Sequence, residues 1–162
     1  MRRGRLVTLR EFTAGDAKLT VGGSADPFND FGPVIANWLS ESAIGRFVVV
    51  RNADGQAVGH VSWHRVHYGP NPESAAWNIG ISLRTDARGQ GLGTEAQRLL
   101  AQHLFATTTL QRVEAVTDVE NVPEQRALAR AGFRREGVLR AAQFRAGRWR
   151  DVDVWSVLRD EV

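Results

Sequence analysis

Residues 79–94 read Ile-Gly-Ile-Ser-Leu-Arg-Thr-Asp-Ala-Arg-Gly-Gln-Gly-Leu-Gly-Thr, and this stretch decides the fold. An apolar strand leads into a loop in which Arg88 precedes the alternate glycines Gly89, Gly91 and Gly93, and helical spacing begins directly afterwards. Glycines let backbone N–H groups approach a ligand, and the start of a helix adds unpaired N–H donors and a partial positive charge. The stretch therefore predicts a site for a phosphorylated ligand where the strand meets the helix.

Three other interpretations of these glycines fit less well. A Walker loop requires a lysine, and the single lysine of the chain is the distant Lys18. A dinucleotide fingerprint counted from Gly91 places Ala96 at its third small position and Glu114 at the distance of a ribose-binding acid, but one strand-to-helix unit is visible where several are needed. A turn that only begins a helix does not account for three glycines behind an arginine.

Strand and helix patterns extend on both sides of this stretch. Alternation of Trp77, Ile79, Ile81 and Leu83 with Asn78 and its neighbours predicts a central strand over 75–83. Apolar spacing predicts helices over about 91–106 and 122–131, with Gly132 after the second. Further strands are expected at 6–9, 47–50, 58–67 and 112–118, and a last hairpin at 133–139 and 152–158 with Gly147 in its connection.

Three segments in this order resemble the GNAT acetyltransferase superfamily. The run Arg88-Gly89-Gln90-Gly91-Leu92-Gly93-Thr94 after a strand looks like its pyrophosphate arm, and Asn121 with a short helix and residues 131–137 is similar to the region closing those domains. Residues 147–152, followed by a strand, resemble the ribosomal-protein-alanine (Rim-type) N-acetyltransferase branch. The resemblance covers about residues 75–159. It implies an α/β fold, with a mixed, mostly antiparallel sheet flanked by helices, in a single domain over 1–162.

The resemblance also implies how acetyl-CoA is bound. The pyrophosphate would lie on the backbone amides of residues 88–94, pantetheine would pair with the backbone in a splayed gap of the sheet, and Asn121 would contact the cofactor. No metal is implied. The expected cofactor-binding residues are Ile81, Ser82, Leu83, Arg88, Gly89, Gln90, Gly91, Leu92, Gly93, Thr94 and Asn121.

Two positions depart from the family's pattern. Many Rim-like sequences carry glutamate where this chain has Asn78, the candidate catalytic residue; an asparagine is no general base but can orient an amine or a water. Its alternative role is to fill the less apolar face of the sheet. Glu124 replaces a serine that is frequent in the family, which argues against serine chemistry there. Asn121-Val-Pro-Glu124 also has the form of a capping box.

A histidine run and an aromatic series invite other functions. On the expected strand, His60 and His64 lie about 13 Å apart at roughly 3.3 Å per residue and His67 faces the other side, so a shared metal site is not expected. Helical spacing within 28–39, and the loops around 22–42 and 143–149, place aromatic side chains in an acceptor pocket or in the core. These are Phe28, Phe31, Trp38, Phe144 and Trp149.

Composition bounds the partners of the chain. Its 162 residues, 43% hydrophobic and 24% charged, suit an ordinary globular domain without an apolar run long enough to span a membrane. The absence of cysteine and of a signal-peptide pattern predicts a cytoplasmic location. The pI near 10.4 reflects arginine, since the net charge is +3. A basic hairpin face is favoured over nucleic-acid binding for Arg134, Arg135, Arg140, Arg145, Arg148 and Arg150.

The sequence thus predicts an acyl-CoA-dependent N-acyltransferase that moves an acetyl group to a primary amine of a small molecule or protein N-terminus by direct attack on the thioester. Without a carboxylate at position 78, an α-amine suits the site better than a lysine amine, because more of it is neutral at pH 7. Asp118, Glu120 or a histidine could relay a proton through water. The alternative is a catalytically silent acyl-CoA-binding module. The oligomeric state is open, with a homodimer as one option.

Overall fold

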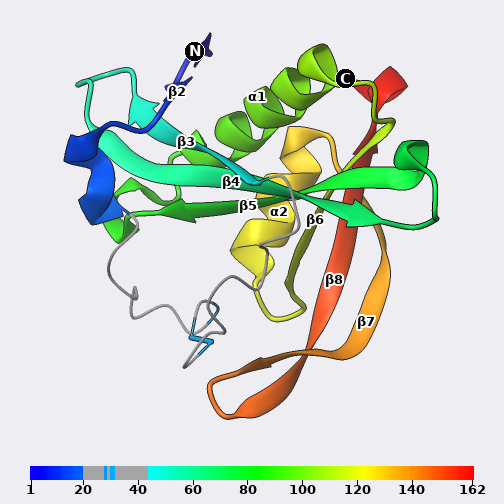
Figure 1. Ribbon diagram of the computed structural model, residues 1–162. Coiled ribbons are helices and arrows are strands. Elements are labelled where there is room, and N and C mark those ends of the chain that lie inside the picture. The colour runs from blue at the N-terminus through cyan, green and yellow to red at the C-terminus, as the bar shows by residue number, and fades with distance from the viewer. Residues whose placement is uncertain (20–27, 29, 32–43) are drawn as a thin grey trace.

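The computed structural model describes residues 1–19, 28, 30, 31 and 44–162 (Figure 1). Within this part, two α-helices and four short 3-10 helices accompany eight strands. The helices are η1 Ala14–Leu19, η2 Pro72–Ser74, η3 Thr85–Ala87, α1 Leu92–Thr107, α2 Val122–Ala131 and η4 Arg159–Glu161. The strands are β1 Arg2–Arg3, β2 Val7–Arg10, β3 Ile44–Arg51, β4 Ala57–His67, β5 Ala75–Leu83, β6 Arg112–Asp118, β7 Arg134–Arg145 and β8 Arg148–Leu158.

The strands form one sheet in the order β1-β2-β3-β4-β5-β6-β8-β7. Its pairs are antiparallel except for β5 and β6, which are parallel and joined through α1. A parallel pair needs such a crossover, since the chain must return to the same end of the sheet. The α/β fold with a mixed, mostly antiparallel sheet flanked by helices is therefore confirmed.

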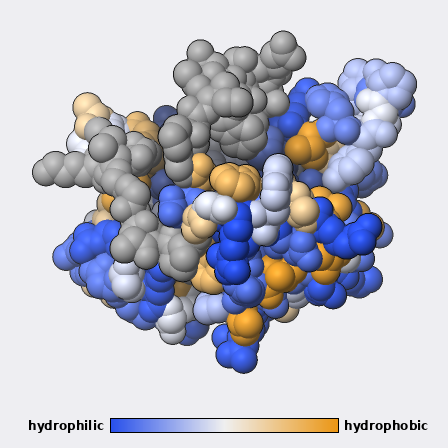
Figure 2. Space-filling model, turned by 90° about the horizontal axis from the view of Figure 1, so that it is seen from below, coloured by the Kyte–Doolittle hydropathy of each residue, from blue (hydrophilic) through white to orange (hydrophobic). Residues whose placement is uncertain are grey.

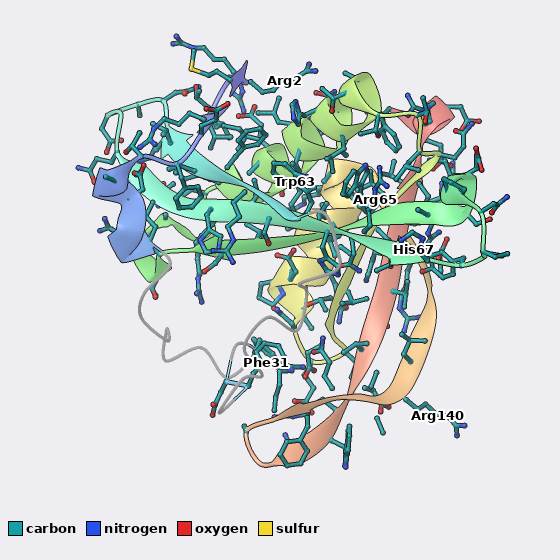
Figure 3. All side chains as sticks on the ribbon, in the orientation of Figure 1. Arg2, Phe31, Trp63, Arg65, His67 and Arg140 are labelled. Atoms are coloured by element: carbon teal, nitrogen blue, oxygen red, sulfur yellow. The ribbon has the colours of Figure 1, made fainter. Side chains whose placement is uncertain are left out.

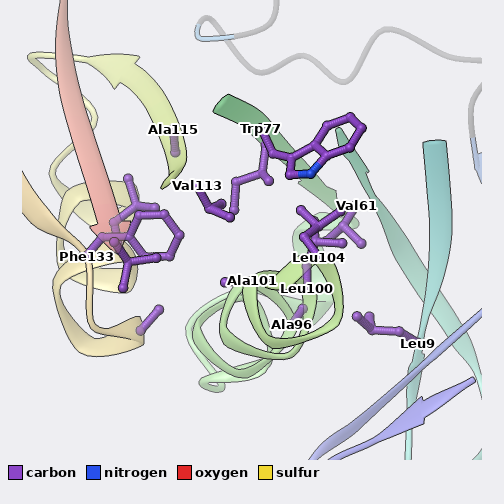
Figure 4. Close-up of a cluster of buried hydrophobic side chains, with 14 of the residues drawn as sticks. Leu9, Val61, Trp77, Ala96, Leu100, Ala101, Leu104, Val113, Ala115 and Phe133 are labelled. Carbon is purple, nitrogen blue, oxygen red and sulfur yellow. The ribbon is translucent and has the colours of Figure 1, made fainter. Parts of the chain in front are cut away.

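The core lies between the sheet and α1, where apolar residues at helical spacing face the strands (Figure 4). Leu100 and Leu104 are buried beside Trp77 of β5 and Val61 of β4. Burying such a side chain contributes about 1.5–3 kcal/mol. The buried face of α1 includes Leu92, Ala96, Leu100 and Leu104, and Leu99 packs at its margin.

Strand β4 confirms the geometry expected for the histidines. Its register against β5 is unbroken, with His60 opposite Ser82, His64 opposite Asn78 and His67 opposite Ala75. His67 therefore faces away from the other two, because side chains alternate along a strand. Across the described segments of the chain, no group of three or more acidic, histidine or cysteine side chains is placed to hold a metal ion.

The last hairpin is longer than predicted. The sequence suggests strands at 133–139 and 152–158, whereas β7 continues to Arg145 and β8 begins at Arg148. The register shifts between Leu139 and Gln143, and Ala141 has a left-handed φ of 48°, so this bulge interrupts the alternation that marks a strand. The turn at Gly147, with φ 73°, is where the sequence places it.

The N-terminal part differs in detail. The expected strand 6–9 is found at Val7–Arg10, the strand 47–50 extends over Ile44–Arg51, and β1 adds a short pair that has no sequence signal. Helical spacing was expected within 28–39. Phe28 and Phe31 of this segment lie in the described part, whereas most of the expected helix, including Trp38, falls outside the described residues.

Candidate active site

Strands β5 and β6 pair over three residues and then part. The last pair in the register is Ile79 with Ala115, but β5 runs on to Leu83 and β6 to Asp118 (Figure 1). The gap opens into a cavity of about 960 Å³ that is bounded by β5, β6, the loop before α1, the start of α2 and β7. The sheet is thus open on both strands next to the helix termini, where a ligand can reach backbone donors.

The loop before α1 forms one end of the cavity. Gly89 and Gly91 have φ of 71° and 78°, a left-handed conformation that other residues adopt only with strain, and Gly91 caps α1. The first amides of α1 have no partner within the helix, so they remain donors for an anion at this end. Gly93 and Arg88 also line the cavity, and Arg88 Nε donates to the Leu83 carbonyl at 3.1 Å.

The free edge of β5 carries further backbone donors and acceptors. The Arg84 amide donates to Val58 of β4 at 2.9 Å, so alternate residues Leu83 and Ile81 turn their backbone groups to the opposite edge, which faces the gap. Ser82 lies between them and turns its own groups toward β4 by the same alternation. An extended chain of amides could therefore pair with Ile81 in place of a neighbouring strand.

The start of α1 is fixed by a carboxylate that the sequence analysis missed. Glu95 accepts hydrogen bonds from the backbone amides of Arg5, Leu6 and Val7 at 3.0, 2.6 and 2.7 Å. These bonds join the beginning of β2 to the first turn of α1, which holds the glycine loop in place. An acidic residue in the first helical turn is common, so its spacing alone carried no sign of this partner.

Most of the residues expected to bind the cofactor line the cavity. The lining includes Ile81, Ser82, Leu83, Arg88, Gly89, Gly91, Gly93, Thr94 and Asn121. Gln90 instead donates to the Asp86 carbonyl at 2.8 Å, and the Leu92 side chain is buried in the core, which leaves their backbone amides as candidate contacts.

The start of α2 forms the wall opposite the loop. Asn121 caps this helix and its Oδ1 accepts from the Glu124 amide at 3.4 Å, as a capping box requires. The second half of the predicted box is wrong: the Asn121 amide donates to the Asp118 carbonyl, and the Glu124 carboxyl bonds with Gln97 of α1. Glu124 is also among the residues that line the cavity.

Burial governs the ionisation of Glu124. Loss of water around the carboxyl raises its pKa to about 7, and the hydrogen bond from Gln97 opposes this shift. Gln97 is itself buried and donates to the Gly93 carbonyl at 3.3 Å. A carboxyl that titrates near neutrality therefore lies in the wall of the cavity, tied to the glycine loop. The sequence marked position 124 only as a departure from the family.

The other end of the cavity is built around a buried ion pair. Arg145 Nη2 lies 2.5 Å from Asp118 Oδ2, and each side chain is 1% exposed. The same guanidinium donates to the Phe28 carbonyl at 2.9 Å and lies 5.7 Å from the centre of the Phe31 ring. Phe28, Phe31 and Arg145 all line the cavity, so side chains from distant parts of the chain form this end.

Asn78 lies beside the point where the strands part, but it is absent from the described cavity lining. Its amide donates to Glu114 Oε1 at 3.1 Å, and Tyr68 and Arg112 donate to Oε2 at 2.5 and 2.9 Å. Burial and this carboxylate raise the pKa of Tyr68 to about 12. Glu114 is thus a buried structural acid, and the dinucleotide interpretation that made it a ribose ligand is wrong.

The arginines of the last hairpin are mostly paired, and one of them is not on the surface. Ion pairs join Arg134 to Glu161, Arg135 to Asp153, and Arg148 and Arg150 to Glu120. Arg145 is buried, which corrects the expectation of a wholly solvated face. Its burial is possible because Asp118, at the end of β6, pairs with it. Arg140 projects outward (Figure 3).

The exposed aromatic side chains of the same hairpin do not line the cavity in the part of the chain that is described. Phe144 and Trp149 are 52% and 65% exposed and pack edge to face. From below, hydrophobic residues form small separate groups among hydrophilic ones rather than one broad patch (Figure 2). The acceptor pocket expected from these two rings is therefore not formed by them.

Comparison with known proteins decides the family. A model of the acetyltransferase (GNAT) domain matches residues 7–134. The chain belongs to the GNAT acetyltransferase family. This confirms the predicted enzyme class, an acyl-CoA-dependent N-acetyltransferase. No helix in the described ranges is both long and apolar enough to cross a membrane.

Relatives refine the position within the GNAT family. An uncharacterized N-acetyltransferase p20 of Bacillus licheniformis is 28% identical over 90% of this chain and 83% of its own. The ribosomal-protein-serine acetyltransferase of Escherichia coli is 26% identical over 66% of this chain and 58% of its own. RimJ of Mycobacterium smegmatis, solved in complex with CoA-disulfide, superposes with a TM-score of 0.78 at 25% identity, covering 96% of this chain and 83% of that one. The resemblance to the Rim-type branch is thus confirmed.

Proposed function

We propose that this GNAT enzyme transfers an acetyl group from acetyl-CoA to a primary amine with a lowered pKa, such as a peptide or protein N-terminal α-amine. The observation that carries the proposal is the gap between β5 and β6, which joins the glycine loop at one end to a pocket of side chains around Asp118 and Arg145 at the other. One end offers donors for phosphates. The other has room for an acceptor next to the free edge of the sheet.

The residues present fit CoA. The left-handed Gly89 and Gly91 bring backbone amides to the cavity, and a Cβ on Gly93 would stand at van der Waals distance from Ile81 and Leu83, in the space the ligand would cross. We infer that the pyrophosphate binds the amides of residues 88–94, with Arg88 adding charge. Pantetheine then pairs with the gap-facing backbone of Ile81 and Leu83, and Asn121 contacts it from α2.

The choice of acceptor follows from protonation. An α-amine with a pKa of about 7.7–8.0 is roughly a tenth neutral at pH 7, whereas a lysine amine near 10.4 is neutral in fewer than about one molecule in a thousand. The difference in the cost of reaching the nucleophilic form is about 3–4 kcal/mol. Position 78 carries an amide and not a carboxylate that could deprotonate the amine. We therefore propose that an amine nitrogen that is already neutral attacks the thioester carbon directly. Asn78 would orient the amine or a water through its place beside the gap.

Paired peptides test the acceptor. The enzyme is incubated with acetyl-CoA and a peptide with a free α-amine, or its N-acetylated counterpart containing lysine, between about pH 6 and 9, a window that spans the α-amine pKa. Free thiol and the mass of the product are followed. We expect the α-amine peptide to have the higher kcat/KM at pH 7. A higher kcat/KM for the lysine peptide at pH 7 would refute the choice of an α-amine as acceptor. If the protein binds acetyl-CoA but acetylates no amine, it is a catalytically silent binding module.

We also propose that residues 1–162 form a single catalytic domain that works in the cytoplasm. Light scattering coupled to gel filtration tests whether the protein forms a homodimer. The expected mass of one chain is 17.9 kDa. A doubled mass that persists on dilution would support a dimer.

A further inference from the structure

Two carboxyl groups line the cavity in the described part of the chain, Asp118 and Glu124. Asp118 is engaged in the buried pair with Arg145 and also accepts from the Glu120 amide at 2.7 Å. Burial lowers the pKa of His60, His64 and His103, and none of these histidines is part of the described lining. Glu124 is therefore the carboxyl that the cavity offers for proton transfer.

The position of Glu124 is set by two helices. Its amide is held by the cap Asn121, and its carboxyl bonds with Gln97, which is buried and anchored on the Gly93 carbonyl. The carboxyl thus belongs to the first turn of α2 and is tied to α1 through Gln97. It reaches the same cavity as Ile81, the residue whose backbone faces the gap.

The surroundings of Glu124 favour a group that changes its charge near pH 7. Burial is the main influence on its pKa, which lies at about 7, and the amide of Gln97 favours the ionised form. General acid–base catalysis is most effective when the pKa of the group lies near the working pH. The charged groups that share the cavity are Asp118, Arg88, Arg126, Arg130 and Arg145.

We propose that Glu124 is a catalytic residue that carries the proton of the acyl-transfer step. As the nitrogen–carbon bond forms, the ionised carboxyl takes one proton from the amine nitrogen. As the carbon–sulfur bond breaks, the carboxyl delivers this proton to the departing sulfur, so that amide and free thiol form and Glu124 is again ionised. The balance needs no other acid or base. The inference rests on the proposed function, since it requires both an amine and a thioester in the cavity.

A carboxyl with this pKa also fits the proposed acceptor. It lies within about one unit of an α-amine but more than three units below a lysine amine, so proton transfer from a lysine ammonium would be strongly uphill. One group in the wall of the cavity therefore accounts for proton transfer and contributes to the choice of amine.

The first experiment replaces the carboxyl with its isosteric amide. Glu124→Gln keeps the size of the side chain and an oxygen that can accept from Gln97, so the fold and the Kd for CoA should be unchanged. We expect kcat to fall by about 100-fold or more, the lower end of typical general acid–base contributions. Glu124→Asp should retain part of the activity. The matched control is Glu73→Gln, a change at an exposed acid outside the cavity lining.

The second experiment moves the titration without removing the group. Because Gln97 lowers the pKa of Glu124, Gln97→Met should raise it. The carboxyl must start ionised, so kcat at saturating substrates falls as the pH drops through its pKa, and this limb should move to higher pH in Gln97→Met. A purely structural role would lower activity at every pH and leave the limb in place. A ¹³C NMR titration of the Glu124 carboxyl measures the same shift directly, including in a variant with little activity.

The outcomes separate this inference from the proposed function. If the wild type acetylates amines and folded Glu124→Gln matches it, or if the limb does not move in Gln97→Met, Glu124 is not the proton carrier. If the wild type acetylates no amine although acetyl-CoA binds, the proposed function itself fails.

Discussion

The two ends of the cavity are built in different ways. The end at which we propose that the phosphates bind, called the phosphate end below, is made of backbone: residues 85–94 come soon after β5, and two left-handed glycines and the first turn of α1 would supply its donors. The pocket at the other end is made of side chains that come from distant parts of the chain, since Arg145 meets Phe28, 117 residues away, and Asp118, 27 residues away. Backbone geometry serves a constant ligand, whereas side chains can be exchanged to suit an acceptor.

The two kinds of construction should respond differently to substitution. Backbone donors depend on a few glycines and on the start of a helix. A pocket of side chains depends on long-range packing and on a desolvated ion pair, so each partner matters to stability as well as to binding. The following predictions use this difference, beginning with the largest expected effect.

Breaking the buried ion pair should destabilise the protein most. Arg145→Met leaves Asp118 buried without its charged partner, and we expect the free energy of unfolding to fall by about 3–5 kcal/mol. Urea denaturation measures the loss. The double variant Asp118→Leu with Arg145→Met should recover much of it, because no unpaired charge remains. A loss near zero in the single variant would show that the acceptor end does not depend on this pair.

At the phosphate end, Arg88→Ala should weaken CoA binding without a comparable loss of stability. A charge-assisted contact to a phosphate contributes about 1.5–3 kcal/mol, so calorimetry should show a correspondingly higher Kd. The matched control is Arg84→Ala, which removes an exposed arginine that pairs with Asp86 on the same loop, outside the cavity lining. Equal CoA affinities in the two variants would show that Arg88 makes no contact with the phosphates.

Gly93→Ala separates binding from folding more finely. Gly93 has no left-handed φ, and a Cβ would meet Leu83 and Ile81 at 3.5 and 3.6 Å, which is ordinary contact, so the apo protein should be as stable as the wild type. The added methyl group would crowd the ligand, and overpacking of this kind costs about 1–3 kcal/mol. Calorimetry should therefore show weaker CoA binding, whereas thermal unfolding of the apo protein should show an unchanged Tm. Gly137→Ala, with open space around its Cβ, is the control that should change neither.

The smallest effect is expected at Asn78. Its amide bonds with Glu114, which keeps its bonds from Tyr68 and Arg112 when Asn78 is removed. Asn78→Ala should therefore lower kcat modestly and leave the Kd for CoA unchanged. Steady-state kinetics with the preferred amine measure both. A variant with wild-type kcat would assign Asn78 to the structure of the sheet alone.

The strand, glycine loop and helix at this end of the cavity could be predicted from the sequence because their signals are local. The alternation in 75–83, the glycines at 89–93 and the apolar spacing of α1 each leave a periodic mark, and the structure places α1 within one residue of its expected start. The resemblance to the GNAT family then supplied the gap in the sheet. The register of β5 and β6 has no comparable mark, since parallel pairing depends on residues 36 positions apart.

The other end of the cavity could not be predicted, because it depends on contacts between distant residues that leave no local mark in the sequence. Nothing near Arg145 indicates that it is buried, because its partner Asp118 lies on another strand, and Phe144 beside it is exposed. Glu124 was hidden by local chemistry: its spacing from Asn121 fits a capping box, yet the carboxyl contacts Gln97 of a different helix. The bulge at Ala141 likewise masked the length of β7.

A crystal structure of the protein with bound CoA would show where each part of the cofactor lies. We expect pyrophosphate oxygens on the amides of residues 88–94, pantetheine paired with the Ile81 backbone, and the sulfur in the gap within reach of the Glu124 carboxyl. CoA bound outside the gap between β5 and β6, or with its phosphates away from the glycine loop, would contradict the account.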